Sequence, residues 1–172
     1  MLEALIFVVF PFCMLFAAIS DMLSMTIANR VSLILAGAFM VVAPLTGMEW
    51  TQYGLHLAAG ALVLACTIGL FALGAMGGGD AKLMAATSVW MGFGTCLVDY
   101  LLIASVIGGL LTMALLVYRG SVLATMTRNN LFLRHFADEK MGIPYGIALG
   151  LGGLLAFPAS PLVQWALERT AS

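Results

Sequence analysis

Long apolar runs separated by short polar stretches dominate this chain, and six of them are candidates for membrane-spanning helices. A helix that crosses the bilayer core requires about 20 mostly apolar residues. The six predicted spans are Leu2–Ile19, Arg30–Thr46, Tyr53–Ala75, Leu83–Gly94, Thr95–Tyr118 and Gly142–Ala166. We expect the first span to be retained, because it carries Glu3 and lacks the basic start of a signal peptide. The pattern predicts an all-α, polytopic membrane protein, a six-transmembrane-helix bundle forming one membrane-embedded domain over residues 1–172.

The composition supports a chain that lies in the lipid bilayer. Hydrophobic residues make up 63% of it and charged residues 9%, whereas a soluble domain is about one quarter charged. A net charge of -1 with 7 Lys+Arg argues against nucleic acid as a partner. Cys13, Cys66 and Cys96 lie singly in apolar runs, and His56 and His135 lack ligand spacing. We therefore expect neither a disulfide framework nor a metal or other cofactor.

The basic residues predict which face of the membrane each loop occupies. With six spans, the first, third and fifth loops share a face that carries Arg30, Lys82, Arg119, Arg128, Arg134 and Lys140. The other face has Arg169 alone. Because Lys and Arg accumulate on the cytoplasmic side, we expect these loops in the cytoplasm. Both termini are then expected outside, which is the periplasm if the source is a Gram-negative bacterium.

The longest polar connection, Arg119 to Met141, has two interpretations. Its apolar residues recur at spacings that could form one helical face: Val122, Leu123, Met126, Leu133 and Phe136. Such a segment could be an interfacial helix on the inner leaflet, with its arginines near lipid phosphates. It could equally be a solvated loop that contains some apolar residues.

Two aspartates, Asp21 and Asp80, are the strongest candidates for chemistry. Asp21 ends the first span in "AISDMLSMTIANR", and Asp80 opens the fourth in "GGGDAKL". The loop assignment puts both at the cytoplasmic face. Like charges that meet cannot both ionise easily, so such a pair shares one proton. The ionised member can activate water while the protonated one hydrogen-bonds a carbonyl, which suits amide hydrolysis.

Each aspartate also has a structural interpretation. Asp80 could be the N-cap residue of a helix that starts after the tight turn Gly77–Asp80. Asp21 could be a boundary residue that pairs with Arg30 or a lipid headgroup. For the glycines, the catalytic interpretation is that a backbone without Cβ atoms lets an extended peptide substrate approach.

Two motifs resemble those of the type IV prepilin peptidases, which are intramembrane aspartyl proteases. "GGGDAKL", Gly77 to Leu83, is similar to the GxGDxKL signature of that family. Asp21 followed by Ile27-Ala28-Asn29 resembles its first motif, in which Ile-Pro-Asn follows the aspartate; here Ala28 replaces the proline. The late stretch "MGIPYGIALGLGG", Met141 to Gly153, resembles the short members associated with Flp-type, tight-adherence pili. Because the insert with paired CxxC motifs is missing, the resemblance implies a peptidase without methyltransferase activity.

The resemblance also implies roles for particular residues, with Asp21 and Asp80 as the catalytic pair. Substrate-binding or site-supporting roles are implied for Gly77, Gly78, Gly79, Lys82, Asn29 and Arg30. Lys82 either lowers the pKa of a nearby carboxylate or anchors the chain at the cytoplasmic face. Pro144 and Tyr145 match the late motif, as packing residues or as substrate contacts.

The predicted function is removal of the leader peptide from a Flp-type prepilin precursor at the bacterial inner membrane. The partner is thus a membrane-inserted helix that carries a basic leader, and the active site faces the cytoplasm. One alternative is a proton- or ion-coupled transporter, in which the two aspartates carry protons. Another is a noncatalytic membrane subunit of pilus assembly.

Overall fold

The computed structural model describes residues 1–121, 126 and 142–171, and within these residues the secondary structure is helical, with no strand. The elements, in chain order, are α1 (Leu2–Ser24), α2 (Asn29–Leu45), α3 (Trp50–Ala72), α4 (Gly78–Met91), α5 (Thr95–Arg119), α8 (Tyr145–Ala156), the 3-10 helix η1 (Phe157–Ala159) and α9 (Pro161–Ala171). The predicted all-α fold is confirmed for this part of the chain.

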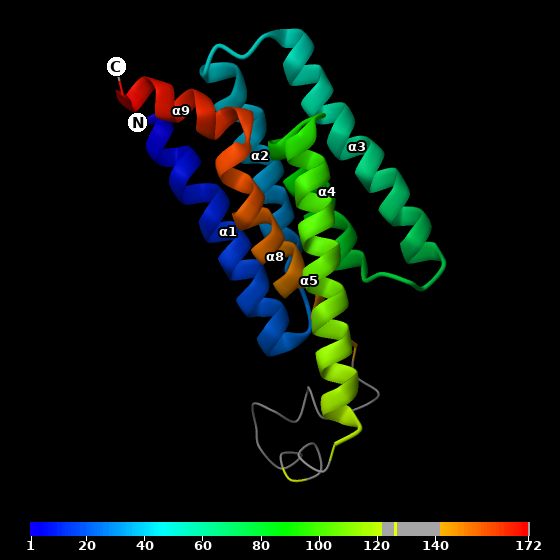
Figure 1. The fold of residues 1–172 in the computed structure, drawn as a ribbon. Helices are drawn as coiled ribbons and strands as arrows, with labels where there is room; N and C mark the ends of the chain where they lie inside the picture. The colour runs from blue at the N-terminus through cyan, green and yellow to red at the C-terminus, as the bar shows by residue number, and fades with distance from the viewer. Residues whose placement is uncertain (122–125, 127–141, 172) are drawn as a thin grey trace.

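The helices of the bundle run roughly alongside one another (Figure 1). Both termini and α9 lie at one end, at the top of the view. The α1–α2 and α3–α4 connections lie toward the other end, as does the end of α5. We call the first the terminal end and the second the loop end. The arrangement therefore gathers the connections that hold Asp21 and Asp80 at one end of the bundle.

The six-span count is not confirmed. Three helices, α1, α3 and α5, are each long and apolar enough to cross a membrane. The bent pair formed by residues Tyr145–Ala159 and Pro161–Thr170 would make a fourth span. With 17 and 14 residues, α2 and α4 fall short of the roughly 20 residues that a spanning helix requires. The described residues thus contain three clear spans, or up to four.

The sixth predicted span, Gly142–Ala166, is wrong as a single continuous helix. After α8 the chain forms η1, passes through an extended Ser160 and starts α9 at Pro161, with a bend of 48°. Pro158 and Pro161 account for the break, because proline lacks the N–H that continues a helix. Buried Leu162 and Val163 are part of the core, and α9 packs on α1. The interfacial helix predicted within Arg119–Met141 falls almost entirely outside the described residues.

Helix α4 lies at the centre of the bundle and contacts α2, α3, α5 and α8. Nearly every residue from Ala81 to Met91 is buried, so this helix has no polar face turned outward. Near its terminal end, Trp90 is fully buried and its Nε1–H donates to the carbonyl oxygen of Leu35 over 2.9 Å. The rings of Phe10, Phe39 and Phe157 pack around Trp90, and His56 stacks on Phe39. We call these five residues the aromatic core.

Glycines let α8 lie directly against α1 and α5. A Cβ added at Gly150 would come within 2.8 Å of the Met14 carbonyl oxygen, and one at Gly152 within 2.9 Å of the Ala104 Cβ. Small residues of this kind allow close backbone approach between membrane helices. The start of α8 is thereby held beside the end of α1, where Asp21 lies.

Candidate active site

Asp21 lies in the last turn of α1. The helix continues past the predicted end at Ile19 to Ser24, and Met25 closes it in the left-handed conformation, with φ of 52°. Asp21 is 5% exposed, and its Oδ2 accepts a hydrogen bond of 2.7 Å from the backbone N–H of Gly146. The last turn of α1 and the first turn of α8 therefore fix this carboxylate between them.

Asp80 lies in the first turn of α4. Gly77 is the N-cap residue and the helix starts at Gly78, so the alternative in which Asp80 itself is the N-cap is wrong. Asp80 is instead the third residue of the helix, and the nearby Gly77 amide favours the charged form of its carboxylate. Its side chain is partly buried. The glycine turn thus both starts the helix and orients the carboxylate.

Both aspartates line one cavity of about 280 Å³. They are 59 positions apart in the sequence, and only the packing of the α1 end beside the α4 start brings them together. We call this space the aspartate cavity. Its lining consists of Asp21, Met25, Thr26, Ile27, Asn29, Gly77, Gly78, Gly79 and Asp80. Of the predicted site residues, the structure therefore gathers both aspartates, Asn29 and the three glycines.

The two carboxylates influence each other electrostatically. Burial, followed by the charge of Asp21, raises the pKa of Asp80 to about 6. Asp80 lies before the apolar part of α4 and outside the helices long enough to span a membrane. A carboxyl group with such a pKa keeps its proton up to about pH 6, well above its ordinary range, next to a second carboxylate that can ionise. This arrangement can provide a general acid and a general base in the same cavity.

The three glycines of the turn differ in what a Cβ at each position would contact. A Cβ at Gly77 would lie 2.7 Å from Asp80 Oδ2, so glycine leaves room for the carboxylate. One at Gly79 would lie 3.3 Å from the Ile27 Cβ, in the α1–α2 connection, whereas one at Gly78 would make only an ordinary contact with Phe71. Gly77 and Gly79 thus shape the cavity itself. Room for a substrate peptide, which the sequence suggested, stays a prediction.

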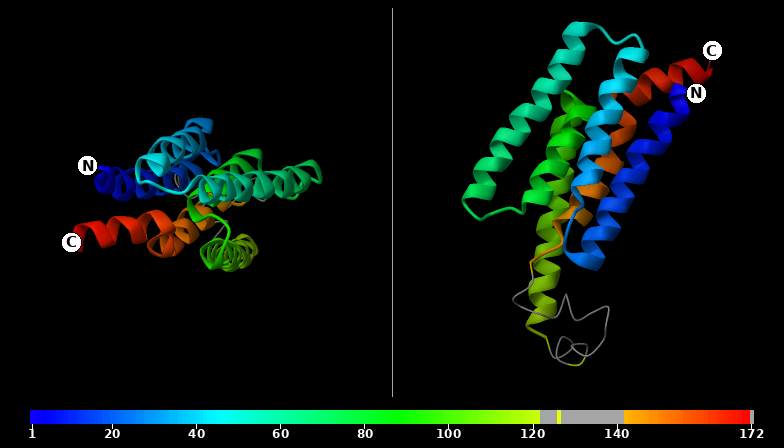
Figure 2. Two further views of the ribbon diagram at one scale, coloured as in Figure 1. Left: turned by 90° about the horizontal axis from the view of Figure 1, so that it is seen from above. Right: turned by 180° about the vertical axis from the view of Figure 1, so that it is seen from behind.

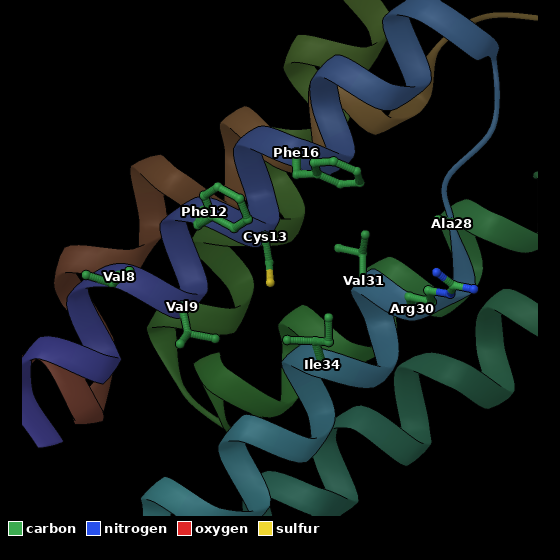
Figure 3. Close-up of a pocket in the computed structure, with 9 residues that line it drawn as sticks. All are labelled: Val8, Val9, Phe12, Cys13, Phe16, Ala28, Arg30, Val31 and Ile34. Atoms are coloured by element: carbon green, nitrogen blue, oxygen red, sulfur yellow. The ribbon is translucent and has the colours of Figure 1, made fainter.

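Lys82 and Arg30 do not line the aspartate cavity. The Lys82 Nζ donates a hydrogen bond of 2.9 Å to Asn29 Oδ1, so Lys82 reaches the cavity only through Asn29. Arg30 lies at the mouth of a separate apolar groove between α1 and α2 (Figure 3). Among the described residues, neither Lys82 nor Arg30 forms an ion pair with Asp21 or Asp80.

Gly146 belongs to the site, and the sequence interpretation missed it. A Cβ there would lie 2.7 Å from the Asp21 Cβ and 2.9 Å from Asp21 Oδ2. Gly146 lies in the late motif Met141–Gly153, directly after Pro144 and Tyr145. Pro144 is fully buried just before α8, and the Tyr145 hydroxyl lies 3.2 Å from Thr112 Oγ1. Both side chains therefore make contacts within the protein.

The described lining of the cavity has two carboxylates and no other His, Cys, Asp or Glu side chain. Within the described ranges, no three His, Cys, Asp or Glu residues lie together as a metal site would need. The chemistry that these groups can perform themselves is proton transfer to and from water or a carbonyl oxygen.

Comparison with protein families gives the arrangement a context. The model of the type IV leader peptidase family matches residues 8–113, more than half of the chain. The match runs from α1 into α5 and includes both aspartates and the glycine turn. Neither the curated proteins nor the solved structures give a match. The spanning helices together with this match show that the chain is a membrane protein and belongs to the type IV leader peptidase family.

Proposed function

We propose that this protein is an intramembrane aspartyl endopeptidase that removes the leader peptide from Flp-type prepilins. The observation that carries the proposal is the aspartate cavity, where Asp21 and Asp80 come together beside the glycine turn. The family match supports the peptidase activity and a prepilin as the substrate class. The Flp-type substrate rests on the resemblance of the late motif to short family members.

The two carboxylates would divide the work of hydrolysis. Asp80 holds the proton of the pair, so Asp21, whose carboxylate the Gly146 amide orients, takes a proton from water. The resulting hydroxide attacks the scissile carbonyl carbon while protonated Asp80 hydrogen-bonds the carbonyl oxygen. When the C–N bond breaks, Asp21 passes its proton to the leaving amine. Asp80 keeps its own proton, and one water has been consumed.

We further propose that the loop end faces the cytoplasm. Arg30 and Lys82 lie near the start of α2 and of α4, and Arg119 ends α5, all toward the loop end, while Arg169 lies in α9 at the terminal end (Figure 1). Positive residues favour the cytoplasmic side. A precursor with a basic cytoplasmic leader and a hydrophobic helix would then bring its cleavage point to the level of the aspartate cavity. This orientation puts both termini outside, at the bacterial inner membrane.

The position of the aspartates favours a protease over an ion-coupled transporter. Asp21 lies in the last turn of α1 and Asp80 in the first turn of α4. Coupling sites of transporters commonly lie near the middle of the membrane, whereas a leader peptidase needs its carboxylates at the boundary. Both carboxylates lie at helix ends.

Co-expression with a Flp-type prepilin tests the proposal, with leader removal measured as a mobility shift on a gel. Asp21→Asn and Asp80→Asn should each lower the processing rate by at least about 100-fold, because each removes one proton-transfer group. Asp99→Asn is the matched control, since Asp99 is exposed and lies outside the cavity. Unchanged processing by either cavity variant would exclude that aspartate from the mechanism. A wild-type protein that leaves the precursor intact would favour the transporter or the noncatalytic subunit.

A further inference from the structure

A second groove adjoins the aspartate cavity, with α2 and α3 as its walls and α4 as its floor. Its volume is about 470 Å³. Helices α2 and α3 contact each other little, because α3 packs on α4 and α2 packs on α4 and α1, with α4 between α2 and α3 in Figure 2. We propose that this substrate groove binds the membrane-spanning helix of the protein that is cleaved. The inference rests on the proposed peptidase function and names where its substrate docks.

The groove is continuous with the aspartate cavity. Asn29 lines both spaces, and Lys82, which bonds Asn29 Oδ1, lines the groove. The Asn29–Lys82 pair therefore marks the point at which an apolar groove meets two carboxylates. A helix that lies in the groove would lead its chain past this pair to Asp21 and Asp80. A bond just beyond the end of the substrate helix would then reach the cavity.

The dimensions and lining of the groove suit a helix. On α2 its lining residues include Asn29, Leu33, Ala36 and Met40, a spacing that forms one helical face. From Asn29 to Met40 the helix rises about 16 Å, which is about three helical turns, so the groove is at least that long. Small residues such as Ala61 also line the walls and floor. They allow the close backbone approach by which membrane helices associate.

A buried hydroxyl in the groove wall lacks a partner. Ser32 is 8% exposed and lines the groove, and its Oγ makes no hydrogen bond to any described residue. A buried polar group without a partner is costly. A serine in a helix commonly bonds the carbonyl four residues back, yet here it does not. The protein covers this Oγ, and a rotation about χ1 of Ser32 would turn the hydroxyl into the groove that the residue lines, where a polar side chain of the occupant would bond it.

The groove between α1 and α2 is the competing site. It has a volume of about 450 Å³ and is lined by bulky Phe12 and Phe16, with Arg30 at its mouth (Figure 3). It shares no lining residue with the aspartate cavity. A helix lying there would end beside Arg30, on the other side of α2 from the Asn29–Lys82 pair.

Two adjacent residues of α2 allow a direct test. Leu33 lines the substrate groove and Ile34 lines the α1–α2 groove, and both are well exposed, at 71% and 55%. A photoreactive amino acid replaces each in turn in full-length Asp80→Asn protein, which is co-expressed with the prepilin in membranes. The expected result is a cross-link to the prepilin from position 33 and little or none from position 34. Wild-type protein processing the same precursor runs in parallel.

Each other outcome contradicts the inference. Equal or stronger cross-linking from position 34, or a lipid adduct alone at position 33, would overturn it while normal processing leaves the peptidase proposal intact. If position 33 gives no cross-link while the wild-type protein processes the precursor normally, the substrate groove is likewise excluded and the peptidase proposal stands. If wild-type protein fails to process the precursor, the peptidase proposal fails and takes this inference with it.

Ser32 provides an independent kinetic test. Ser32→Ala should raise the KM for prepilin roughly two- to tenfold, the value of one hydrogen bond, and leave kcat unchanged. Ser105→Ala is the control, since Ser105 is exposed on α5 and does not line the groove. Removing an unpaired buried hydroxyl should not lower thermal stability. An unchanged KM, or a loss confined to kcat, would contradict a hydroxyl that binds the substrate helix.

Discussion

The two ends of α4 meet the rest of the protein in opposite ways. At the terminal end, Trp90 fills the aromatic core, and polar atoms such as His56 Nδ1 donate to backbone carbonyls. At the loop end, glycines and carboxylates leave a cavity of about 280 Å³. One short helix thus combines an end built for packing with an end that keeps space open. Substitutions at the first should change stability, and substitutions at the second should change catalysis.

The largest expected effect on stability is at the packed end. Trp90→Ala should lower the free energy of unfolding by about 3–5 kcal/mol, because it leaves a cavity and removes the hydrogen bond to Leu35. Thermal unfolding in detergent measures the loss. At temperatures where the variant is folded, leader removal should continue at close to the normal rate. A well-folded Trp90→Ala protein without activity would break the separation between the two ends.

At the loop end, the largest effect is expected from Gly146→Ala. The new Cβ would approach the Asp21 Cβ to 2.7 Å, so α8 or Asp21 must shift and their hydrogen bond is strained. We expect a loss of about 1–3 kcal/mol in stability from overpacking and roughly 100-fold in processing rate. Gly109→Ala is the control, because nothing lies within 4 Å of its added Cβ. Normal processing by Gly146→Ala would contradict a positioning role for this contact.

The processing rate should also fall as the pH rises above about 6. Asp80 then loses its proton, and the pair no longer contains an acid. The processing rate should therefore fall roughly tenfold for each further pH unit. The raised pKa means that the folded protein holds this proton more tightly than the unfolded chain. Its contribution to stability is therefore present below about pH 4 and lost through about pH 6. In Asp80→Asn this part of the pH dependence of stability should disappear.

The smallest effect is expected from Gly77→Ala. The Asp80 carboxylate, at the flexible end of its side chain, can move away from a Cβ that would lie 2.7 Å from it. The processing rate should fall up to about tenfold, and the stability by less than about 1 kcal/mol. Gly78→Ala adds a Cβ in ordinary contact with Phe71, so its rate should match wild type. Equal rates for the two variants would show that Gly77 does not shape the site.

Much of the helical layout could be predicted from the sequence, because each apolar run satisfies its own backbone hydrogen bonds. The α5 prediction ended within one residue of the observed helix. The errors came where local signals compete: α1 continues past its predicted end at Ile19 to Ser24, and two prolines divide the last predicted span. The start of α4 inside the glycine run was also missed. Propensity alone does not fix such ends, since packing decides whether a helix continues.

The candidate site was predicted in part. Both aspartates were named from their motifs, but only the packed structure shows that they share a cavity. Arg30, adjacent to Asn29 in the sequence, belongs to a different groove, because neighbouring positions on a helix point about 100° apart. Gly146 was missed because its importance comes from a contact with Asp21, 125 positions earlier.

The sequence by itself determined that this chain forms apolar helices in a membrane and that two carboxylates occur at helix ends. These features depend on hydrophobicity and on hydrogen bonds between near neighbours, which are local. The tertiary structure decided that the end of α1 lies beside the start of α4 and that Gly146 bonds Asp21. It also decided which face of α2 opens onto the aspartate cavity. Those relations depend on how helices far apart in the chain pack, and no local pattern encodes that packing.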